Sequence, residues 1–265
     1  MLEELKSIIA KVIFKVSRLV LGILGTNIGT VNAPNRYPEL SQEELLFCER
    51  VFQRSLTMTS LESLKTLALC CKYVDKAGIE GAFVEAGVWR GGSALVAKYV
   101  LAKDRRILLY DTFNGMTEPG EKDFRLGEST NENSLNKWNS LRTETGNGWV
   151  AASLDEVKRN FGLFKLLDNQ VEFIVGDVQV TLLREENLPD RIAILRLDTD
   201  FYSSTLFELE TFWPKVANGG VVILDDYGHW EGAKSAADEF FSSNVINALM
   251  VPIAGGGGRL IVKTH

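Results

Sequence analysis

Cysteine is scarce in this 265-residue chain, which contains only Cys48, Cys70 and Cys71. Their spacing forms no CxxC pair, and an odd number leaves one thiol unpaired. Because Cys70 and Cys71 are adjacent within an apolar run of helical character, we interpret the cysteines as buried free thiols. This use of cysteine favours a reducing, cytoplasmic compartment.

An excess of positive charge is also missing. The 29 Lys and Arg residues are outnumbered by 35 Asp and Glu residues, which gives a net charge of -6. A protein that binds nucleic acid needs a basic surface, so this balance argues against nucleic acid as the main partner. The hydrophobic content of 45% is that of an ordinary globular protein, and the length suits one large α/β domain with appendages.

A long uncharged hydrophobic segment is absent at the N-terminus, where residues 1–24 instead interleave Lys and Arg with apolar residues. The spacing predicts a cationic amphipathic helix that is too interrupted by charge to span a bilayer, and no signal-peptide cleavage site follows. Three interpretations stay open for this helix: packing on the protein body or on a second subunit of a homo-oligomer, peripheral binding to an anionic inner membrane face, or a disordered leader. Residues 25–34 are predicted to be a linker, so residues 1–34 form an appendage.

The next segment, residues 35–80, is predicted to be helical. Ser41 begins a helix with a capping box completed by Glu44, and a second helix starts near Ser60 and runs through Tyr73. Helices placed before the first strand are expected to lie over the sheet edge or the ligand crevice as a lid. The alternative for Thr57 and Met58, between the two helices, is an ordinary connecting loop.

Residues 81–265 alternate between strand and helix patterns, which predicts an α/β sheet, mostly parallel, with an antiparallel closing strand. The expected strands are residues 81–85, 106–110, 171–175, 192–197, 221–224, 248–253 and 259–263. The expected helices of this part are residues 93–101, 154–161, 204–216 and 232–241. Asn218-Gly219-Gly220 is the predicted stop signal of the third of these helices. A polar insertion, residues 114–149, interrupts the pattern and is predicted to be a cover over the substrate.

The first strand ends in a glycine-rich turn, residues 85–93 (EAGVWRGGS), and a helix with Ser93 near its N-cap follows. Strand, glycine turn and helix are the parts of a nucleotide-type cofactor site in an open α/β sheet. The turn lacks the GxGxxG spacing of a dinucleotide site, and the acid Glu85 would repel a pyrophosphate. An NAD-dependent oxidoreductase is therefore the disfavoured alternative.

Every predicted strand of the parallel part ends on a carboxylate. These acids are Glu85, Asp111, Asp177, Asp198 and the pair Asp225-Asp226. Because the carboxyl ends of parallel strands line the ligand crevice, the acids predict a cationic, metal-containing or hydroxyl-rich ligand. S-adenosylmethionine fits: Glu85 beside its sulfonium and amino-acid moiety, Asp111 at the ribose diol and Asp177 at the adenine amino group.

Four motifs of the sequence resemble the macrocin O-methyltransferase family. They are residues 85–93, 110–116 (YDTFNGM), 197–205 (LDTDFYSST) and 225–228 (DDYG), within a resemblance that covers roughly residues 50–263. It implies a Rossmann-like class I methyltransferase fold with a seven-stranded sheet and helices on both faces. It also implies S-adenosylmethionine as cofactor, and we expect cofactor contacts from five residues: Glu85, Gly87, Ser93, Asp111 and Asp177.

The resemblance further implies a divalent metal, usually Mg²⁺, held by Asp198, Asp225 and Asp226. Hard oxygen ligands without neighbouring His or Cys suit Mg²⁺ better than Zn²⁺. Asp198 is then the expected general base, with Asp200 as an alternative. His229 is either an auxiliary base that touches substrate or a hydrogen-bonded loop residue.

Together these features predict a Mg²⁺-dependent O-methyltransferase that acts on a hydroxyl of a sugar or other glycosylated small molecule. A catechol-type O-methyltransferase would use the same three acids on an aromatic diol. A non-catalytic, membrane-associated scaffold that binds cofactor or glycan is the alternative from another class, although a scaffold has no need of three metal-ligating acids.

Overall fold

The hydrophobic runs of the sequence form one seven-stranded sheet. The computed structural model describes residues 36–264. Its strands are β1 Ala82–Ala86, β2 Ile107–Asp111, β3 Val171–Val175, β4 Ile192–Leu197, β5 Val216–Leu224, β6 Val251–Pro252 and β7 Arg259–Val262. They are ordered β3-β2-β1-β4-β5-β7-β6, with β1 to β5 parallel and β7 antiparallel to β5. The predicted fold class, with its antiparallel closing strand, is confirmed.

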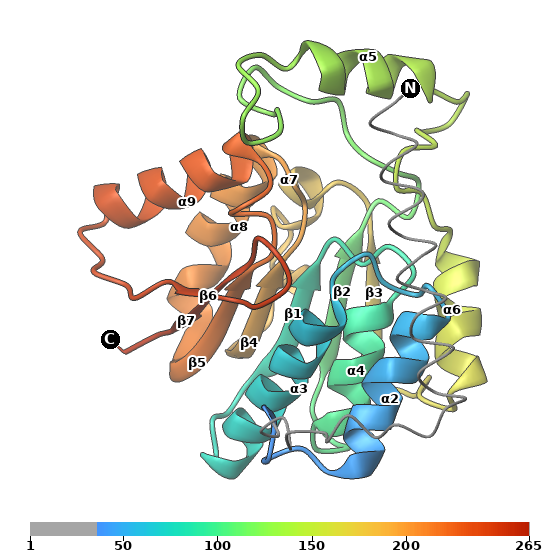
Figure 1. Ribbon diagram of the computed structural model, residues 1–265, viewed down its shortest axis with the longest axis vertical. Coiled ribbons are helices and arrows are strands. Elements are labelled where there is room, and N and C mark those ends of the chain that lie inside the picture. The colour runs from blue at the N-terminus through green and yellow to red at the C-terminus, as the bar shows by residue number, and fades with distance from the viewer. Residues whose placement is uncertain (1–35, 265) are drawn as a thin grey trace, which may run out of the picture. The chain divides into compact units, whose positions relative to one another are not determined.

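Helices cover both faces of the sheet (Figure 1). One face carries α2 Gln42–Gln53, α3 Leu61–Lys76, α4 Gly92–Val100 and α6 Leu154–Leu163; the other carries α7 Val178–Thr181, α8 Tyr202–Phe212 and α9 Glu231–Ser243. Single 3-10 turns, η1 Glu185–Asn187 and η2 Trp213–Lys215, precede β4 and β5. The remaining helix, α5 Glu132–Ser140, lies beyond the end of the sheet and apart from these layers.

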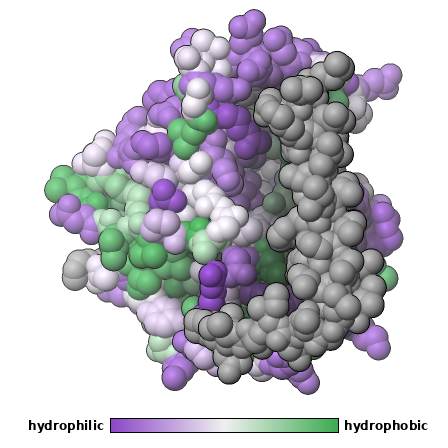
Figure 2. Space-filling model, in the orientation of Figure 1, coloured by the Kyte–Doolittle hydropathy of each residue, from purple (hydrophilic) through white to green (hydrophobic). Residues whose placement is uncertain are grey.

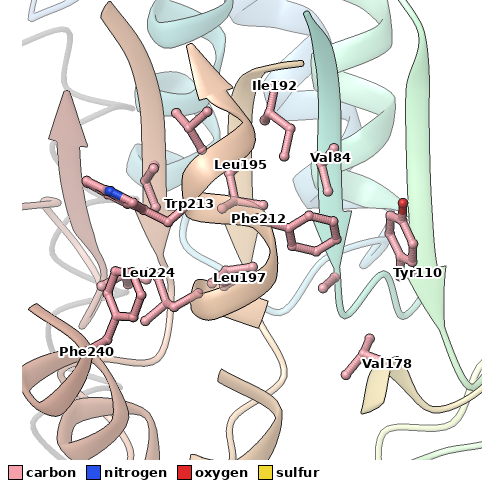
Figure 3. Close-up of a cluster of buried hydrophobic side chains, with 14 of the residues drawn as sticks. Val84, Tyr110, Val178, Ile192, Leu195, Leu197, Phe212, Trp213, Leu224 and Phe240 are labelled. Carbon is pink, nitrogen blue, oxygen red and sulfur yellow. The ribbon is translucent and has the colours of Figure 1, made fainter. Parts of the chain in front are cut away.

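One hydrophobic core cluster lies between the sheet and the layer of α7, α8 and α9. All residues of β1 and β4 are buried, as expected for central parallel strands that have helices on both faces. Figure 3 shows Phe212 of α8 directed toward Val84 and Tyr110, and its ring centroid lies 5.4 Å from that of Tyr110. The core therefore fixes the central strands whose carboxyl ends form the site.

The helix caps partly agree with the sequence. The capping box of Ser41 and Glu44 is present, and the Ser60 hydroxyl caps α3. The N-cap of α4 is Gly91, which has a left-handed φ of 84°. Ser93 lies near this N-cap, as predicted, but inside the helix. Its hydroxyl does not cap the helix, because it donates to Glu85 instead.

The boundary between α8 and β5 differs from the prediction. The helix ends at Phe212, a 3-10 turn containing Pro214 follows, and β5 already begins at Val216. Asn218-Gly219-Gly220 is thus a strand irregularity rather than a helix stop: the register against β4 shifts between Ile192 and Ile194. The closing strand β6 is confined to Val251–Pro252, shorter than the predicted residues 248–253.

The N-terminal predictions are tested only in part. The appendage of residues 1–34 falls outside the described residues. Within residues 36–264, no helix combines the length and apolarity needed to cross a bilayer. Helices α2 and α3 pack on α4, and the segment between them reaches the ligand cavity through Met58, Thr59 and Ser60. The lid role of residues 35–80 stays a prediction, whereas the three cysteines are confirmed as buried free thiols.

Candidate active site

A cavity of about 870 Å³ opens at the carboxyl ends of the parallel strands. Its walls include Gly87, Asp111, Asp177, Asp198, Asp225, Asp226 and His229, all of which the sequence predicted as site residues. The volume falls in the upper part of the range typical of ligand pockets, so it can hold a cofactor together with an acceptor. Glu85 and Ser93 do not line it.

The glycine turn brings the ends of β1 and β4 into direct backbone contact. Gly87 has a φ of 83°, and a Cβ built there would overlap the carbonyl oxygen of Asp198. The Asp198 amide donates to the carbonyl of Ala86 at 2.9 Å. Glycine is required here both by the left-handed backbone and by this close approach. The turn and the acid Asp198 are thereby held at a fixed separation.

Asp111 organises the same turn from the neighbouring strand. Its Oδ2 accepts hydrogen bonds from the amides of Val88 (2.7 Å) and Trp89 (3.0 Å), and its Oδ1 accepts from Phe113 (2.7 Å). Burial raises the pKa of Asp111, and the three amides oppose that shift. The carboxylate therefore already has partners within the protein, and its contact with a ribose diol stays a prediction.

Asp177 follows β3 and caps the short helix α7. Its Oδ1 accepts from the Gln179 amide at 2.8 Å, and the residue lines the cavity. The predicted contact with an adenine amino group would use the same carboxylate. That contact also stays a prediction.

Beneath the cavity, one buried arginine joins three of the predicted acids. The Arg196 Nη1 lies 2.6 Å from Glu85 Oε1 and 2.8 Å from Asp198 Oδ2, and its Nη2 lies 2.9 Å from Asp225 Oδ1. Ser93 donates to the same Glu85 oxygen at 2.5 Å. Glu85 is wholly buried, so it can act on a ligand in the cavity only through these neighbours.

Sequence reasoning missed Arg196, although a signal was present. It is the single charged residue inside the otherwise apolar run of residues 192–197, which forms a strand buried on both faces. A charge is rarely placed there unless it is paired. A ring of acids at the strand ends could have been matched with this cation.

The three predicted metal ligands lie together. One carboxylate oxygen from each of Asp198, Asp225 and Asp226 lies within 4.8 Å of the others. Burial raises the pKa of Asp198 well above its ordinary value, and the charges of Asp225 and Asp226 add to this effect while Arg196 opposes it. Burial also raises the pKa of Asp226 strongly, with further contributions from Asp200 and Asp225. One arginine does not neutralise these acids.

The donor set fits a hard divalent cation. Arg196 occupies only one oxygen of Asp198 and one of Asp225, and Asp226 Oδ2 accepts from the Asp200 amide at 3.0 Å. The second oxygens of Asp198 and Asp225 accept no hydrogen bond from the part of the chain that the structure describes. Three clustered carboxylate oxygens with excess negative charge are ligands that suit Mg²⁺.

Asp200 and His229 complete this end of the cavity. Asp200 adopts a left-handed φ of 63°, and burial together with the charge of Asp198 raises its pKa to about 7. The amide of His229 donates to the carbonyl of Asp226 at 2.8 Å, and its own carbonyl accepts from Leu126 of the insertion at 3.0 Å. His229 therefore connects the acids to the insertion, and its role as an auxiliary base stays a prediction.

The insertion, residues 114–149, borders the cavity as expected of a cover. It contains the helix α5, which the sequence did not predict. Trp149, Phe201 and Trp230 form a separate aromatic cluster with ring centroids 5.5 to 6.1 Å apart. The buried Asp123 accepts from the amides of Tyr202 and Gly120, both at 2.7 Å. These contacts attach residues 114–149, the cover, to the helices after β4 and β5.

Comparisons with known proteins agree with this geometry. A family model described as macrocin-O-methyltransferase (TylF) matches residues 38–257. The chain is 37% identical over 175 residues to an 8-demethyl-8-(2,3-dimethoxy-alpha-L-rhamnosyl)-tetracenomycin-C 4'-O-methyltransferase of Streptomyces olivaceus; the match covers 64% of this chain and 62% of that protein. It is 35% identical over 189 residues to a demethyldecarbamoylnovobiocin O-methyltransferase of Streptomyces niveus, with 69% and 67% covered.

A solved structure of the O-methyltransferase NovP superposes with a TM-score of 0.67 at 31% identity, and the match covers 79% of this chain and 82% of that one. The sequence matches thus span 62% and 67% of the two relatives' own lengths.

Proposed function

Because the chain belongs to the macrocin-O-methyltransferase family, we propose that it transfers a methyl group from S-adenosylmethionine to a hydroxyl of a sugar or glycosylated small molecule, with Mg²⁺ bound by Asp198, Asp225 and Asp226. The observation that carries the proposal is the direct contact between the two halves of the site. Gly87 of the cofactor turn touches the backbone of Asp198, so a methyl donor on the turn and a hydroxyl at the acids share one cavity.

The acids suit both ligands electrostatically. A sulfonium cofactor is cationic. Five acidic side chains lie at or beneath the site, Glu85, Asp198, Asp200, Asp225 and Asp226, and within residues 36–264 the only cation in ion-pair contact with any of them is Arg196. The bound divalent cation would supply Lewis-acid stabilisation of the negative charge that develops on the acceptor oxygen, and would favour the ionised form of its ligands. Asp198 then accepts the hydroxyl proton as general base.

Positioning of the donor and acceptor atoms supplies the remaining part of the rate acceleration. The methyl group passes in line from sulfur to oxygen, so the two atoms must be held near contact and aligned. The backbone contact between Gly87 and Asp198 fixes the distance between the donor and acceptor sides. His229 lines the cavity next to Asp226, so its side chain could form a hydrogen bond with the sugar.

The proposal is tested by Asp198→Asn. This change keeps the size of the side chain but removes a metal ligand and the base, so methyl transfer is expected to fall by at least about 10²-fold. Affinity for S-adenosylhomocysteine, measured by calorimetry without metal, should stay close to that of the wild type. Asp190→Asn, an exposed acid just before β4, is the matched control. Full activity of Asp198→Asn would refute the metal and base roles.

The acceptor class is tested by a methyl-transfer screen with and without Mg²⁺. Sugar and glycoside acceptors form one arm, and catechols form the other because an aromatic diol could use the same acids. We expect product from the sugar arm, dependent on Mg²⁺. Product from catechols alone would replace the sugar assignment. Binding of S-adenosylhomocysteine with no product from any acceptor would favour a non-catalytic scaffold, and tighter binding of NAD would refute the cofactor.

A further inference from the structure

The cover contributes two cationic side chains to the wall of the cavity. Arg125 precedes α5 and Lys137 lies within it, and both line the same cavity as the acids of the strand ends. Apart from the cofactor's own amino-acid carboxylate, the ligands considered so far, which are a sulfonium, a metal and neutral hydroxyls, have no use for positive charge in the wall. The role of these two residues therefore needs a separate explanation.

Both cations rest on one aromatic surface. The Arg125 Cζ lies 4.4 Å from the ring centroid of Trp230, and the Lys137 Nζ lies 4.4 Å from that of Trp149. The two indole rings are buried, and their centroids are 6.0 Å apart. Cation–π contact holds each charge in place while its N–H groups stay available as donors.

Across residues 36–264, Arg125 and Lys137 form no ion pair with a carboxylate. The charge of Arg125 does lower the pKa of Asp200, so it acts on that acid from beyond ion-pair distance. The neighbouring basic residues differ: Arg90, also in the cavity wall, is 2.9 Å from Glu156, and Lys122 of the cover is 3.7 Å from Glu239. The acids of the strand ends pair with Arg196 instead. Two charges held on a cavity wall without a carboxylate in ion-pair contact, among the residues that the structure describes, are suited to an anionic ligand.

On the basis of the function proposed above, we infer that the acceptor is an acidic sugar, whose phosphate or carboxylate is bound by Arg125 and Lys137 while its hydroxyl lies at Asp198. Each cation can form charge-assisted hydrogen bonds with such a group, and Arg125 can do so in a bidentate manner. The acids and the cations would then bind opposite ends of one acceptor molecule. An acidic acceptor would also be oriented, because its anion is repelled by the acids.

The test uses the full chain loaded with S-adenosylhomocysteine. Calorimetry compares glucose 1-phosphate, glucuronate and neutral glucose as probes, and the first two distinguish phosphate from carboxylate recognition. We expect at least one acidic sugar to bind about tenfold or more tightly than glucose, with a preference that weakens as salt is added. Equal affinity for all three probes, or no binding of either acidic sugar, would overturn the inference.

Variants test whether Arg125 and Lys137 cause the preference for acidic sugars over glucose. Arg125→Gln and Lys137→Gln should each remove most of it, whereas Arg125→Lys and Lys137→Arg, which keep the charge, should retain part of it. Lys122→Gln is the matched control, since Lys122 also stacks on an aromatic ring, that of Tyr202, but does not line the cavity. An unchanged preference in both Gln variants would overturn the assignment. Failure of the wild type to bind S-adenosylhomocysteine would instead count against the proposed function.

Discussion

The cavity has two sides that are built in opposite ways. Its floor consists of the acids Asp198, Asp225 and Asp226 at the strand ends, with Glu85 and Arg196 beneath them. There the contacts to Arg196 measure 2.6 to 2.9 Å, and the arginine side chain is 4% exposed. The cover is mostly polar on its outside, as the purple upper end of Figure 2 shows. It is attached through one aromatic cluster, Asp123 and backbone hydrogen bonds of Phe124 and Leu126.

This difference suits the floor to the methyl-transfer reaction and the cover to recognition of the acceptor. The floor belongs to central strands whose positions are fixed by the core, and a reaction that needs alignment is best placed there. The cover is an insertion that can change in sequence without disturbing the sheet, so it is suited to selecting the acceptor. Changes in the floor should therefore destabilise the whole domain, and changes in the cover should act locally.

Arg196→Met is expected to have the largest effect. It leaves Glu85, Asp198 and Asp225 without their shared counterion, and removing one partner of a buried ion pair costs about 3–5 kcal/mol. Urea denaturation would measure the loss in the free energy of unfolding. Arg191→Met, at the other end of the same strand, is the control, because its pair with Glu80 is exposed and should contribute at most about 1 kcal/mol.

A double variant identifies the cause. If the loss comes from uncompensated charge, Glu85→Gln combined with Arg196→Met should be more stable than Arg196→Met alone. Equal stability of the two would instead point to lost packing of the arginine side chain.

Gly87→Ala is the second test of the rigid floor. An alanine there needs a left-handed backbone, which costs about 1–2 kcal/mol, and its Cβ would also overlap the carbonyl of Asp198. We expect a total loss of at least about 2 kcal/mol, together with loss of S-adenosylhomocysteine binding in calorimetry. In the cover, Gly127 has a φ of 97° and open space around it, so Gly127→Ala should cost only the backbone term. Similar losses for the two variants would contradict the contrast between floor and cover.

The floor was largely predictable from the sequence. Parallel strands bring their carboxyl ends to one edge, so the acids that follow the apolar runs could be assigned to one site from the order of the elements alone. The indirect position of Glu85 was not predictable in the same way. It depends on which side of β1 the carboxylate faces and on Arg196 being its partner, and continuous hydrophobic strands carry no alternation that reveals facing.

The cover was predictable only as a polar insertion. Its helix α5 has no side-chain cap and only one buried residue, Ser134, so neither a capping signal nor an apolar stripe marks it. Asp123 and Trp149 are anchors through contacts with residues far along the chain, Tyr202 and Trp230. Such long-range partners leave no local pattern in the sequence.

Trp149→Ala tests whether the cover can open while the sheet stays folded. Removing a buried tryptophan from a core costs about 3–5 kcal/mol, but a cover that can detach limits the global loss to the free energy of its local opening, which is smaller. Hydrogen exchange should show faster exchange in residues 114–149 while the strands remain protected. Affinity for S-adenosylhomocysteine should change little. Deprotection of β1 and β4 would show that the cover is part of the same cooperative unit.

The last effect is a dependence of stability on pH, and it is expected from Glu208, a buried carboxyl that forms no ion pair within residues 36–264. It is fully buried in α8, and only one of its oxygens has a partner, the Thr199 hydroxyl at 3.0 Å. Burial raises its pKa from the ordinary 4.5 to about 8, and the charge of Asp177 adds to this shift. The folded protein therefore holds a proton that the unfolded chain releases. The stabilisation is complete below pH 4.5 and is lost as the pH rises through about 8.

Glu208→Gln replaces the protonated carboxyl with a neutral amide and removes this dependence on pH. The wild type should lose stability relative to the variant by at most about 1.4 kcal/mol for each pH unit between 4.5 and 8, and the difference should be constant outside this window. Denaturant titrations of both proteins at several pH values measure it. Glu156→Gln in α6, which replaces a partly exposed carboxylate paired with Arg90, is the control variant. A constant difference across the whole range would mean that Glu208 is ionised in the fold and has a partner other than Thr199.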